Sequence, residues 1–262
     1  MKVRRQGFTL IEVSLFLAIT ALLFFGVTLG VRGSIFQQRY NDSVQNFAEF
    51  LRSTYSEVTN VEHTGTGTSD QAIYGKILSF GESYDLAGNN INENKVFSYV
   101  VVGNIGDNCS SGGGNGCNVL QILQSLGANI VKDGELVGIP REYTLKWGAG
   151  LQTTATYSGA YVPFSGMVLI VRHPETGTVY TFFNENKMEV NHMLKTGAPI
   201  SLSLVNNAGV SNNWVQQEID FCINPFGDAE SSTRRDVRII KNAQNASGVE
   251  IMSQDGAENK CE

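Results

Sequence analysis

The stretch FTLIEVSLFLAITALLFFGVTLGV, Phe8–Val31, decides how this chain is organised. It is an apolar run of 24 residues with a single charged residue, Glu12. As an α-helix it would be about 36 Å long, enough to cross the roughly 30 Å of hydrocarbon in a membrane. The sequence therefore predicts a membrane-spanning helix close to the N-terminus.

The residues before this run predict its orientation. Lys2, Arg4 and Arg5 precede it with no acidic residue among them, which favours a cytoplasmic N-terminus and an exported body. An ordinary secretory signal has a shorter apolar core and a small-residue cleavage site, whereas this run is longer and lacks an A-x-A sequence. A plain membrane anchor remains an alternative. It gives no reason for Glu12, since a carboxylate at the bilayer centre costs on the order of 2.5–3.5 kcal/mol.

Beyond Val31, apolar residues recur at helical spacing, with Gln, Arg, Glu and Ser on the other faces. This pattern is typical of an amphipathic helix that lays one apolar stripe on a globular domain. It predicts a continuous helix from Phe8 to about Asn60, about 80 Å long, which HTGTGTSD at His63–Asp70 ends. The residues of the predicted stripe are Ile35, Val44, Phe47, Leu51, Tyr55 and Val58.

After Ser69, β-forming runs alternate with turn-forming residues, which predicts a mostly antiparallel β domain. The segments HPETG and NAQNASG separate two pairs of runs and predict two hairpins. The predicted fold class is therefore α+β, with one long N-terminal helix packed on this β domain. The candidate strands are Tyr74–Phe80, Lys95–Val102, Val119–Leu123, Tyr143–Trp147, Gly166–Arg172, Thr178–Phe183, Ile200–Val205, Glu218–Ile223, Asp236–Lys241 and Val249–Met252.

The segment RRQGFTLIEVSLFLAITALLFFGV resembles the class III leader of type IV prepilins and pseudopilins. In that family a prepilin peptidase cuts after the Gly of GFTLIE and methylates the new N-terminal residue. The resemblance implies cleavage between Gly7 and Phe8 and N-methylation of Phe8. It also implies that Glu12, the fifth residue of the mature chain, meets the N-terminal amine of a neighbouring subunit. Such pairing makes a buried charge tolerable.

The same resemblance implies an organisation and a function. Residues 1–7 would be the leader, 8–33 the membrane and filament-core helix, 34–62 its amphipathic continuation, and 63–262 the globular β domain. The chain would be a structural, minor subunit of a type IV pilus or a related type II secretion or competence filament. Its implied partners are other pilin subunits, the prepilin peptidase, the pilus assembly platform and the cytoplasmic membrane, with the β domain outside the cytoplasm.

A second, shorter resemblance suggests an alternative role. YGKILSFGE and the later CINPFG and RRDVRIIKNAQNASGVEI are similar to H-type minor pseudopilins and DNA-uptake minor pilins. This implies a minor pilin that captures DNA or a surface ligand, with Arg234, Arg235 and Arg238 as candidate phosphate contacts. On a strand, Arg234 and Arg238 would share one face and Arg235 the other. The competing interpretation is a solvated edge strand whose charges prevent aggregation.

Charge weighs against general nucleic-acid binding. The whole chain has a net charge of −6, and without its three N-terminal basic residues the body carries −9, because 16 basic residues face 25 acidic ones. An acidic body repels phosphate. Binding to nucleic acid would therefore depend on the local arginine cluster.

The four cysteines, Cys109, Cys117, Cys222 and Cys261, lie in surroundings rich in Asn, Gly and Ser. Their even number predicts disulfides in an oxidising compartment, with free cytosolic thiols and zinc ligation as alternatives. Pairing Cys109 with Cys117 would close a short Gly-rich loop and leave Cys222 with Cys261. The crossed pairings remain open, since four cysteines allow three connectivities.

No catalytic motif accompanies these features. His63, His173 and His192 are far apart, and neither H-E-x-x-H nor G-x-S-x-G occurs. The Gly-rich segment GGGNGC lacks the Lys-Ser/Thr of a phosphate-binding loop. The sequence therefore predicts no enzyme, no cofactor and no bound metal.

Overall fold

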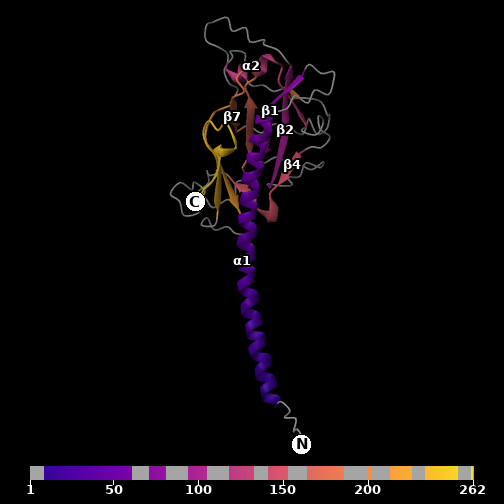
Figure 1. Cartoon of the computed structure of the whole chain (residues 1–262), viewed down its shortest axis with the longest axis vertical. Coiled ribbons are helices and arrows are strands. Elements are labelled where there is room, and N and C mark those ends of the chain that lie inside the picture. Colours follow the sequence, from indigo (N-terminus) through magenta and orange to yellow (C-terminus); the bar gives the residue numbers. More distant parts are fainter. Residues whose placement is uncertain are drawn as a thin grey trace, which may run out of the picture. The chain divides into compact units, whose positions relative to one another are not determined.

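The computed structural model describes residues 9–60, 71–80, 94–104, 118–132, 141–152, 164–185, 200–201, 213–225, 234–252 and 261. The chain divides into two compact units, Met1–Asp42 and Ser43–Glu262. Helix α1, Leu10–Thr59, contributes to both units (Figure 1). The predictions for Gly7, Phe8, Cys109 and Cys117 and for the segment His63–Asp70 lie outside the described residues.

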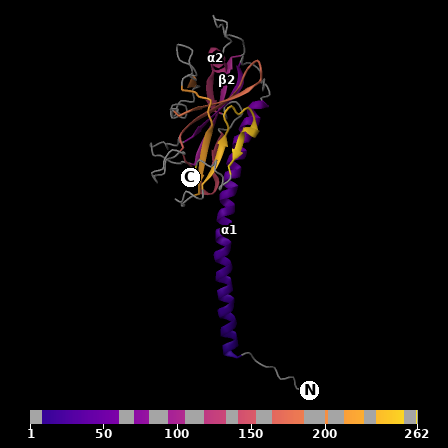
Figure 2. The ribbon, with the colours of Figure 1, turned by 90° about the vertical axis from the view of Figure 1, so that its left-hand side faces the viewer.

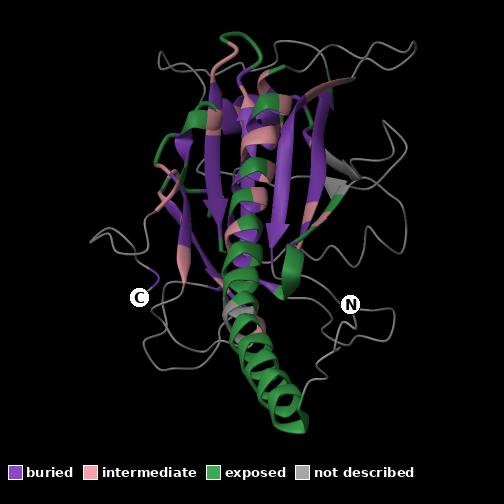
Figure 3. Ribbon diagram, turned by 60° about the horizontal axis from the view of Figure 1, so that its bottom comes forward, coloured by how far each residue is buried: buried purple, intermediate pink, exposed green. Residues whose placement is uncertain are grey.

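The long helix is confirmed, with bounds close to the predicted ones. In the first unit its described side chains are exposed on every face over most of its length, as the green ribbon of Figure 3 shows. Ile35, which the sequence places in the apolar stripe, belongs to this unit and is 42% exposed. The buried positions therefore begin later than predicted, at Tyr40, and continue with Ser43 and Val44 in the second unit.

The second unit contains two sheets in which the described strand pairs are antiparallel. The larger sheet has seven strands in the order β7-β6-β1-β2-β3-β8, with β4 also paired to β2, and the smaller has four in the order β11-β10-β9-β5. The larger sheet comprises β1 Gln71–Phe80, β2 Lys95–Asn104, β3 Asn129–Lys132, β4 Arg141–Thr144, β6 Gly166–Arg172, β7 Val179–Asn184 and β8 Ile200–Ser201. The smaller comprises β5 Gly150–Gln152, β9 Ile219–Asn224, β10 Arg235–Ile239 and β11 Val249–Ile251.

Both predicted hairpins are present, as β6–β7 and β10–β11. One predicted strand is wrong: Val119–Leu123 lies within helix α2, Val119–Ser125. Asn118 Oδ1 accepts a hydrogen bond from Gln121 N, and Gln121 Oε1 accepts one from Asn118 N, which forms a capping box at the helix N-terminus.

The other departures concern short elements. The predicted strand Tyr143–Trp147 ends as β4 at Thr144, and a 3-10 turn follows at Lys146–Gly148. Trp147 there has φ of 61°, a left-handed conformation that a strand does not contain. Strands β3 and β5, of four and three residues, were not predicted.

One face of the larger sheet is covered by α1. The second-unit part of α1 runs along the strands of the β domain (Figure 2), and its buried stripe faces the larger sheet. At its start Phe47 contacts Tyr143 of β4 at a ring distance of 6.0 Å, and Phe50 stacks on the same ring at 4.4 Å. Burial raises the pKa of Tyr143 to about 12. The stripe consists of Val44, Phe47, Ala48, Leu51, Tyr55 and Val58, each at most 1% exposed.

The opposite face of the larger sheet is covered by α2 and Trp214. Buried residues of β1, β2, β6 and β7 pack here against Leu120, Leu123 and Leu126, in one continuous core. Strands covered on both faces are expected to be almost uniformly apolar, and MVLIV of β6 follows this rule.

A group of aromatic rings joins the two sheets. Phe221 of β9 contacts Phe47 of α1, Phe80 of β1 and Phe164, with ring centroids 4.7–5.4 Å apart. Phe164 in turn contacts Phe183 of β7. Because each of these rings is buried, α1 and the two sheets pack together on this side of the larger sheet.

The close approach of β1 to β6 gives a test of this packing. A Cβ placed on Gly75 would collide with Ile170 O and lie 2.7 Å from Val171 Cα. We expect Gly75→Ala to lower the free energy of unfolding by about 3 kcal/mol, because backbone rather than a side chain blocks the methyl group. Urea denaturation of the full chain in detergent, followed by tryptophan fluorescence, measures this change.

The matched control is Gly26→Ala in α1, where nothing lies within 4 Å of the added methyl group. It should leave the unfolding midpoint unchanged. An equally small effect at Gly75 would show that β1 and β6 can separate without cost.

Candidate functional site

The N-terminal part of α1 is the first candidate site. Leu10–Thr28 is a segment of 19 residues with mean hydropathy 2.4, none of it buried. It is the one helix among the described residues that is long and apolar enough to cross a membrane. An apolar surface of this kind marks a segment that meets lipid or another apolar surface.

Glu12 lies in the first turn of this segment and is held by Thr9. The backbone N and the hydroxyl of Thr9 both donate to Glu12 Oε2, at 2.9 and 3.0 Å. Glu12 N donates in return to Thr9 Oγ1 at 3.3 Å. This reciprocal capping box satisfies donors that the first turn leaves open, and it fixes the carboxylate at the positive end of the helix. Because Gly7 and Phe8 lie outside the described residues, the predicted cleavage, methylation and amine contact stay predictions.

At its other end α1 is fastened by polar contacts within the second unit. Glu57 pairs with Lys76 of β1 at 2.5 Å, and Arg52 Nη2 donates to Val249 O of β11 at 3.0 Å. Arg172 Nη1 of β6 lies 3.5 Å from Thr59 O, the last residue of the helix. The last turn of α1 has no basic residue of its own, so Arg172 supplies the positive charge that favours a helix C-terminus.

A chain of buried hydroxyl groups links α1 to both sheets. Tyr55 Oη and Thr181 Oγ1 of β7 are 2.7 Å apart, and the Thr181 hydroxyl donates to Ala243 O, after β10, at 2.9 Å. Since the Thr181 proton is used for Ala243, Tyr55 must be the donor to Thr181. Burial raises the pKa of Tyr55, which its bond to Thr181 only partly offsets, so the phenol remains protonated.

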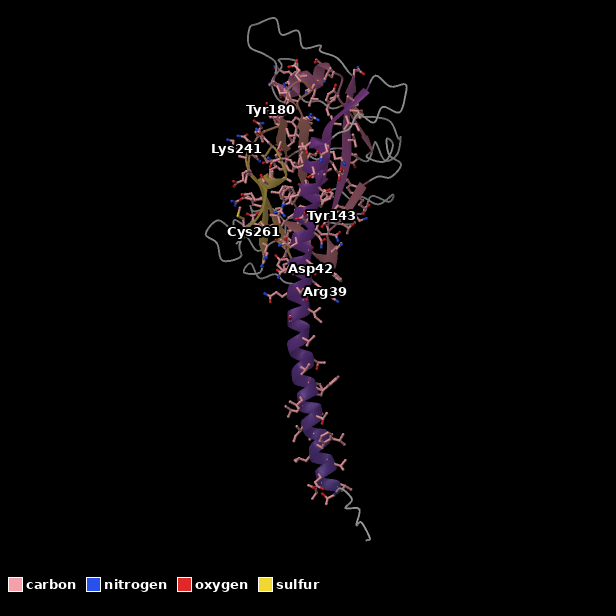
Figure 4. The ribbon with its side chains drawn as sticks, in the orientation of Figure 1. Arg39, Asp42, Tyr143, Tyr180, Lys241 and Cys261 are labelled. Carbon is pink, nitrogen blue, oxygen red and sulfur yellow. A yellow bond between two sulfur atoms is a disulfide. The ribbon has the colours of Figure 1, made fainter. Side chains whose placement is uncertain are left out.

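The second candidate site is the smaller sheet. Cys222 of β9 and Cys261 form a disulfide, both residues are buried, and Figure 4 labels Cys261 beside these strands. This is the pairing that a local Cys109–Cys117 bond would leave. Cys222 lies directly opposite Asp236 in the β9–β10 ladder, so the disulfide and this carboxyl group occupy the same face of the sheet.

The burial and contacts of Arg238 bear on both roles predicted for the arginine cluster. Arg238 is 6% exposed, and its Nε lies 2.5 Å from Asp220 Oδ1 and its Nη2 3.1 Å from Asp236 Oδ2. This guanidinium group is thus buried and occupied by acidic partners, which weighs against Arg238 as a DNA contact. The predicted DNA contacts of Arg234, Arg235 and Arg238 stay predictions. The edge-strand alternative is wrong, because β10 lies between β9 and β11.

The neighbouring arginines are less enclosed. Arg235 begins β10 and is half-buried, as is Arg234 just before it. Alternation along β10 puts Asp236 and Arg238 on one face and Arg235 on the other. Arg235 and Arg238 thus lie on opposite faces, as the sequence predicted. Asp220 and Asp236 were not singled out as candidate site residues from the sequence, although EID and DVR alternate charged and apolar residues.

No family model, curated protein or solved structure matches this chain. The assignment of a function therefore depends on the residues themselves. Within the described ranges, His, Cys, Asp and Glu do not gather into a group of three able to hold a metal ion.

The buried arginine yields a prediction. Arg238→Met keeps an apolar stem of similar length but leaves Asp220 and Asp236 without their cation. We expect a loss of about 3–5 kcal/mol in the free energy of unfolding, the usual result of breaking a buried pair from one side. Urea denaturation measures it.

Lys241→Met, at an exposed position after the same strand, is the control and should cost less than about 0.5 kcal/mol. Equal small effects of the two substitutions would mean that Arg238 is dispensable to the sheet.

Proposed function

We propose that this chain is a structural, non-enzymatic subunit of a type IV pilin-like filament, of a pilus or of a related secretion or competence fibre. It is inserted in the cytoplasmic membrane through Leu10–Thr28. The second unit, which contains both sheets and is called the β unit below, lies outside the cytoplasm. Prepilin peptidase cuts between Gly7 and Phe8 and methylates Phe8. The subunit then assembles with other pilin subunits through its N-terminal helix.

The observation that carries this proposal is the continuity of α1. One helix is apolar on all faces from Leu10 to Thr28, and from Ser43 to Thr59 it forms part of the core of the β unit. An ordinary anchor or signal sequence has no need to be built into the fold that follows it. A filament subunit does, since its outer domain must be held rigidly to the helix that packs at the axis.

Glu12 favours helix partners over lipid alone. Its carboxylate lies three residues into a helix whose neighbouring side chains are exposed and apolar, so in a bilayer it would be costly unless paired. The amine of a neighbouring subunit offers a charge-assisted hydrogen bond. Thr9 holds the carboxylate until that partner arrives, by the contacts described above.

The disulfide is consistent with export, because such bonds persist in oxidising compartments. Capture of DNA by the C-terminal arginines is the weaker alternative, since Arg238 is enclosed by carboxylates. A structural role in the filament requires none of these arginines to be exposed.

Intact mass and N-terminal sequencing of the protein from native membranes or sheared filaments test the proposal. The expected product begins with N-methyl-Phe8, has the mass of residues 8–262 with its disulfides, and is recovered from filaments. A chain that still begins with Met1, or is cut well after Val31, would exclude prepilin processing and favour an anchored or secreted β protein.

A substitution at Glu12 tests assembly separately from insertion. Glu12→Gln keeps the size and hydrogen-bonding capacity of the side chain but removes its charge. We expect normal membrane insertion and at least about a tenfold loss of the protein from sheared filaments, from one lost charge-assisted contact per subunit. Ser14→Ala, which removes a hydroxyl bonded to Ile11 O in the same segment, should leave filament recovery unchanged. Normal filaments from Glu12→Gln would rule out the amine pairing.

A further inference from the structure

Three charged groups lie together on the face of the smaller sheet that carries the Cys222–Cys261 disulfide. Arg238 of β10 bridges Asp220 of β9, directly opposite in the ladder, and Asp236, two residues earlier on its own strand. Asp236 is fully buried, and its second oxygen, Oδ1, has no hydrogen-bond donor among the described residues. Arg238 thus contacts two carboxyl groups, of which that of Asp236 is shielded from water.

Among the residues that the structure describes, three more charged side chains lie near this face. Glu218 precedes β9 and lies 3.5 Å from Arg238 Nε, but it is partly exposed and adds a further negative charge. Glu250 of β11 is opposite Arg238 in the ladder and is exposed. Arg234, just before β10, is half-buried, and the remaining neighbour of Asp236 across the ladder is the uncharged disulfide of Cys222.

The formal charges of Asp220, Asp236 and Arg238 indicate why a proton would be held here. With both Asp220 and Asp236 ionised, the trio that they form with Arg238 carries a net negative charge, which is unfavourable where Asp236 is fully buried. One proton on Asp236 makes the trio neutral and turns two acceptors into a donor and an acceptor. A hydrogen bond between the two carboxyl groups then becomes possible, as in other carboxyl pairs that share a proton.

We propose that Asp220 and Asp236 share one proton beside Arg238, and that this proton makes the smaller sheet and its Cys222–Cys261 disulfide a pH-sensitive element. Loss of the proton to water leaves a buried net charge between β9 and β10 and loosens the strand that carries Cys222. The device is independent of the proposed filament function, because it requires only the folded second unit.

The direction of the effect follows from the pKa of Asp236. Burial, then the charge of Asp220, raises it from 3.8 to about 7, which Arg238 only partly offsets. Between these two values the folded chain holds a proton that the unfolded chain has released. Stability is therefore gained as the pH falls through this window and is lost as the pH rises through about 7.

Thermal unfolding of the full chain in detergent tests the proposal at intervals from about pH 5 to about pH 8. For the wild type we expect the midpoint to fall by roughly 5–10 °C as the pH rises. Asp236→Asn copies the protonated carboxyl group in shape and in its one donor and one acceptor side. It should unfold at the acidic wild-type midpoint throughout and show no fall. Glu250→Gln, on the same face but exposed, should keep the wild-type profile.

A wild-type midpoint that stays constant or rises with pH would overturn the proposal, as would an Asp236→Asn midpoint that falls in parallel with the wild type. If Asp236→Asn does not fold, the infrared spectrum of the wild type decides. A protonated-carboxyl band at about pH 6 that disappears by about pH 8 supports the shared proton, and its absence at about pH 6 excludes it.

The disulfide gives a second readout. At about pH 8, dithiothreitol should reduce Cys222–Cys261 several-fold faster in the wild type than in Asp236→Asn, because the ionised site loosens β9. Both proteins meet the same reductant at the same pH, so the thiolate fraction of the reagent cancels. Equal rates would show that the disulfide is not coupled to the carboxyl pair.

Discussion

The hydroxyl chain from Tyr55 through Thr181 to Ala243 O joins the three parts of the second unit: helix α1, the larger sheet and the turn after β10 in the smaller sheet. Each such hydrogen bond contributes only about 1 kcal/mol net. The buried stripe of α1 around it contributes far more, at roughly 1.5–3 kcal/mol for each large apolar side chain. Burial therefore supplies the stability, while the hydroxyl chain defines one position for the helix among many apolar ones.

This arrangement makes α1 unusual in what its sequence must satisfy. One half must be apolar on all faces, and the other half must restrict apolar residues to a single stripe so that the remaining faces meet water. The aromatic contacts of Phe221 with Phe47 and Phe80 then bring helix and both sheets into one core. A defect in any of the three should be felt by the others, because these rings pack against one another.

Much of this could be predicted, since long periodic segments and turn-bounded hairpins carry strong local signals. The error at Val119–Leu123 arose because a short apolar run of Val, Leu and Ile suits either a buried strand or a helix. Its spacing and the Asn118–Gln121 capping box favoured a helix. The contacts of the arginine cluster could not be predicted, for another reason. Asp220 comes to lie beside Asp236 and Arg238 only through the pairing of β9 with β10, which residue types alone do not reveal.

The way α1 ends has a mechanical consequence. Within the second unit, Ser43–Thr59 of α1 runs along the strands of the larger sheet (Figure 3), and its buried side chains pack against them. Load applied lengthwise is shared by the whole stripe and by the contacts of Arg52, Glu57 and Thr59 at once. This part of the helix can therefore leave the sheet only when many contacts break together.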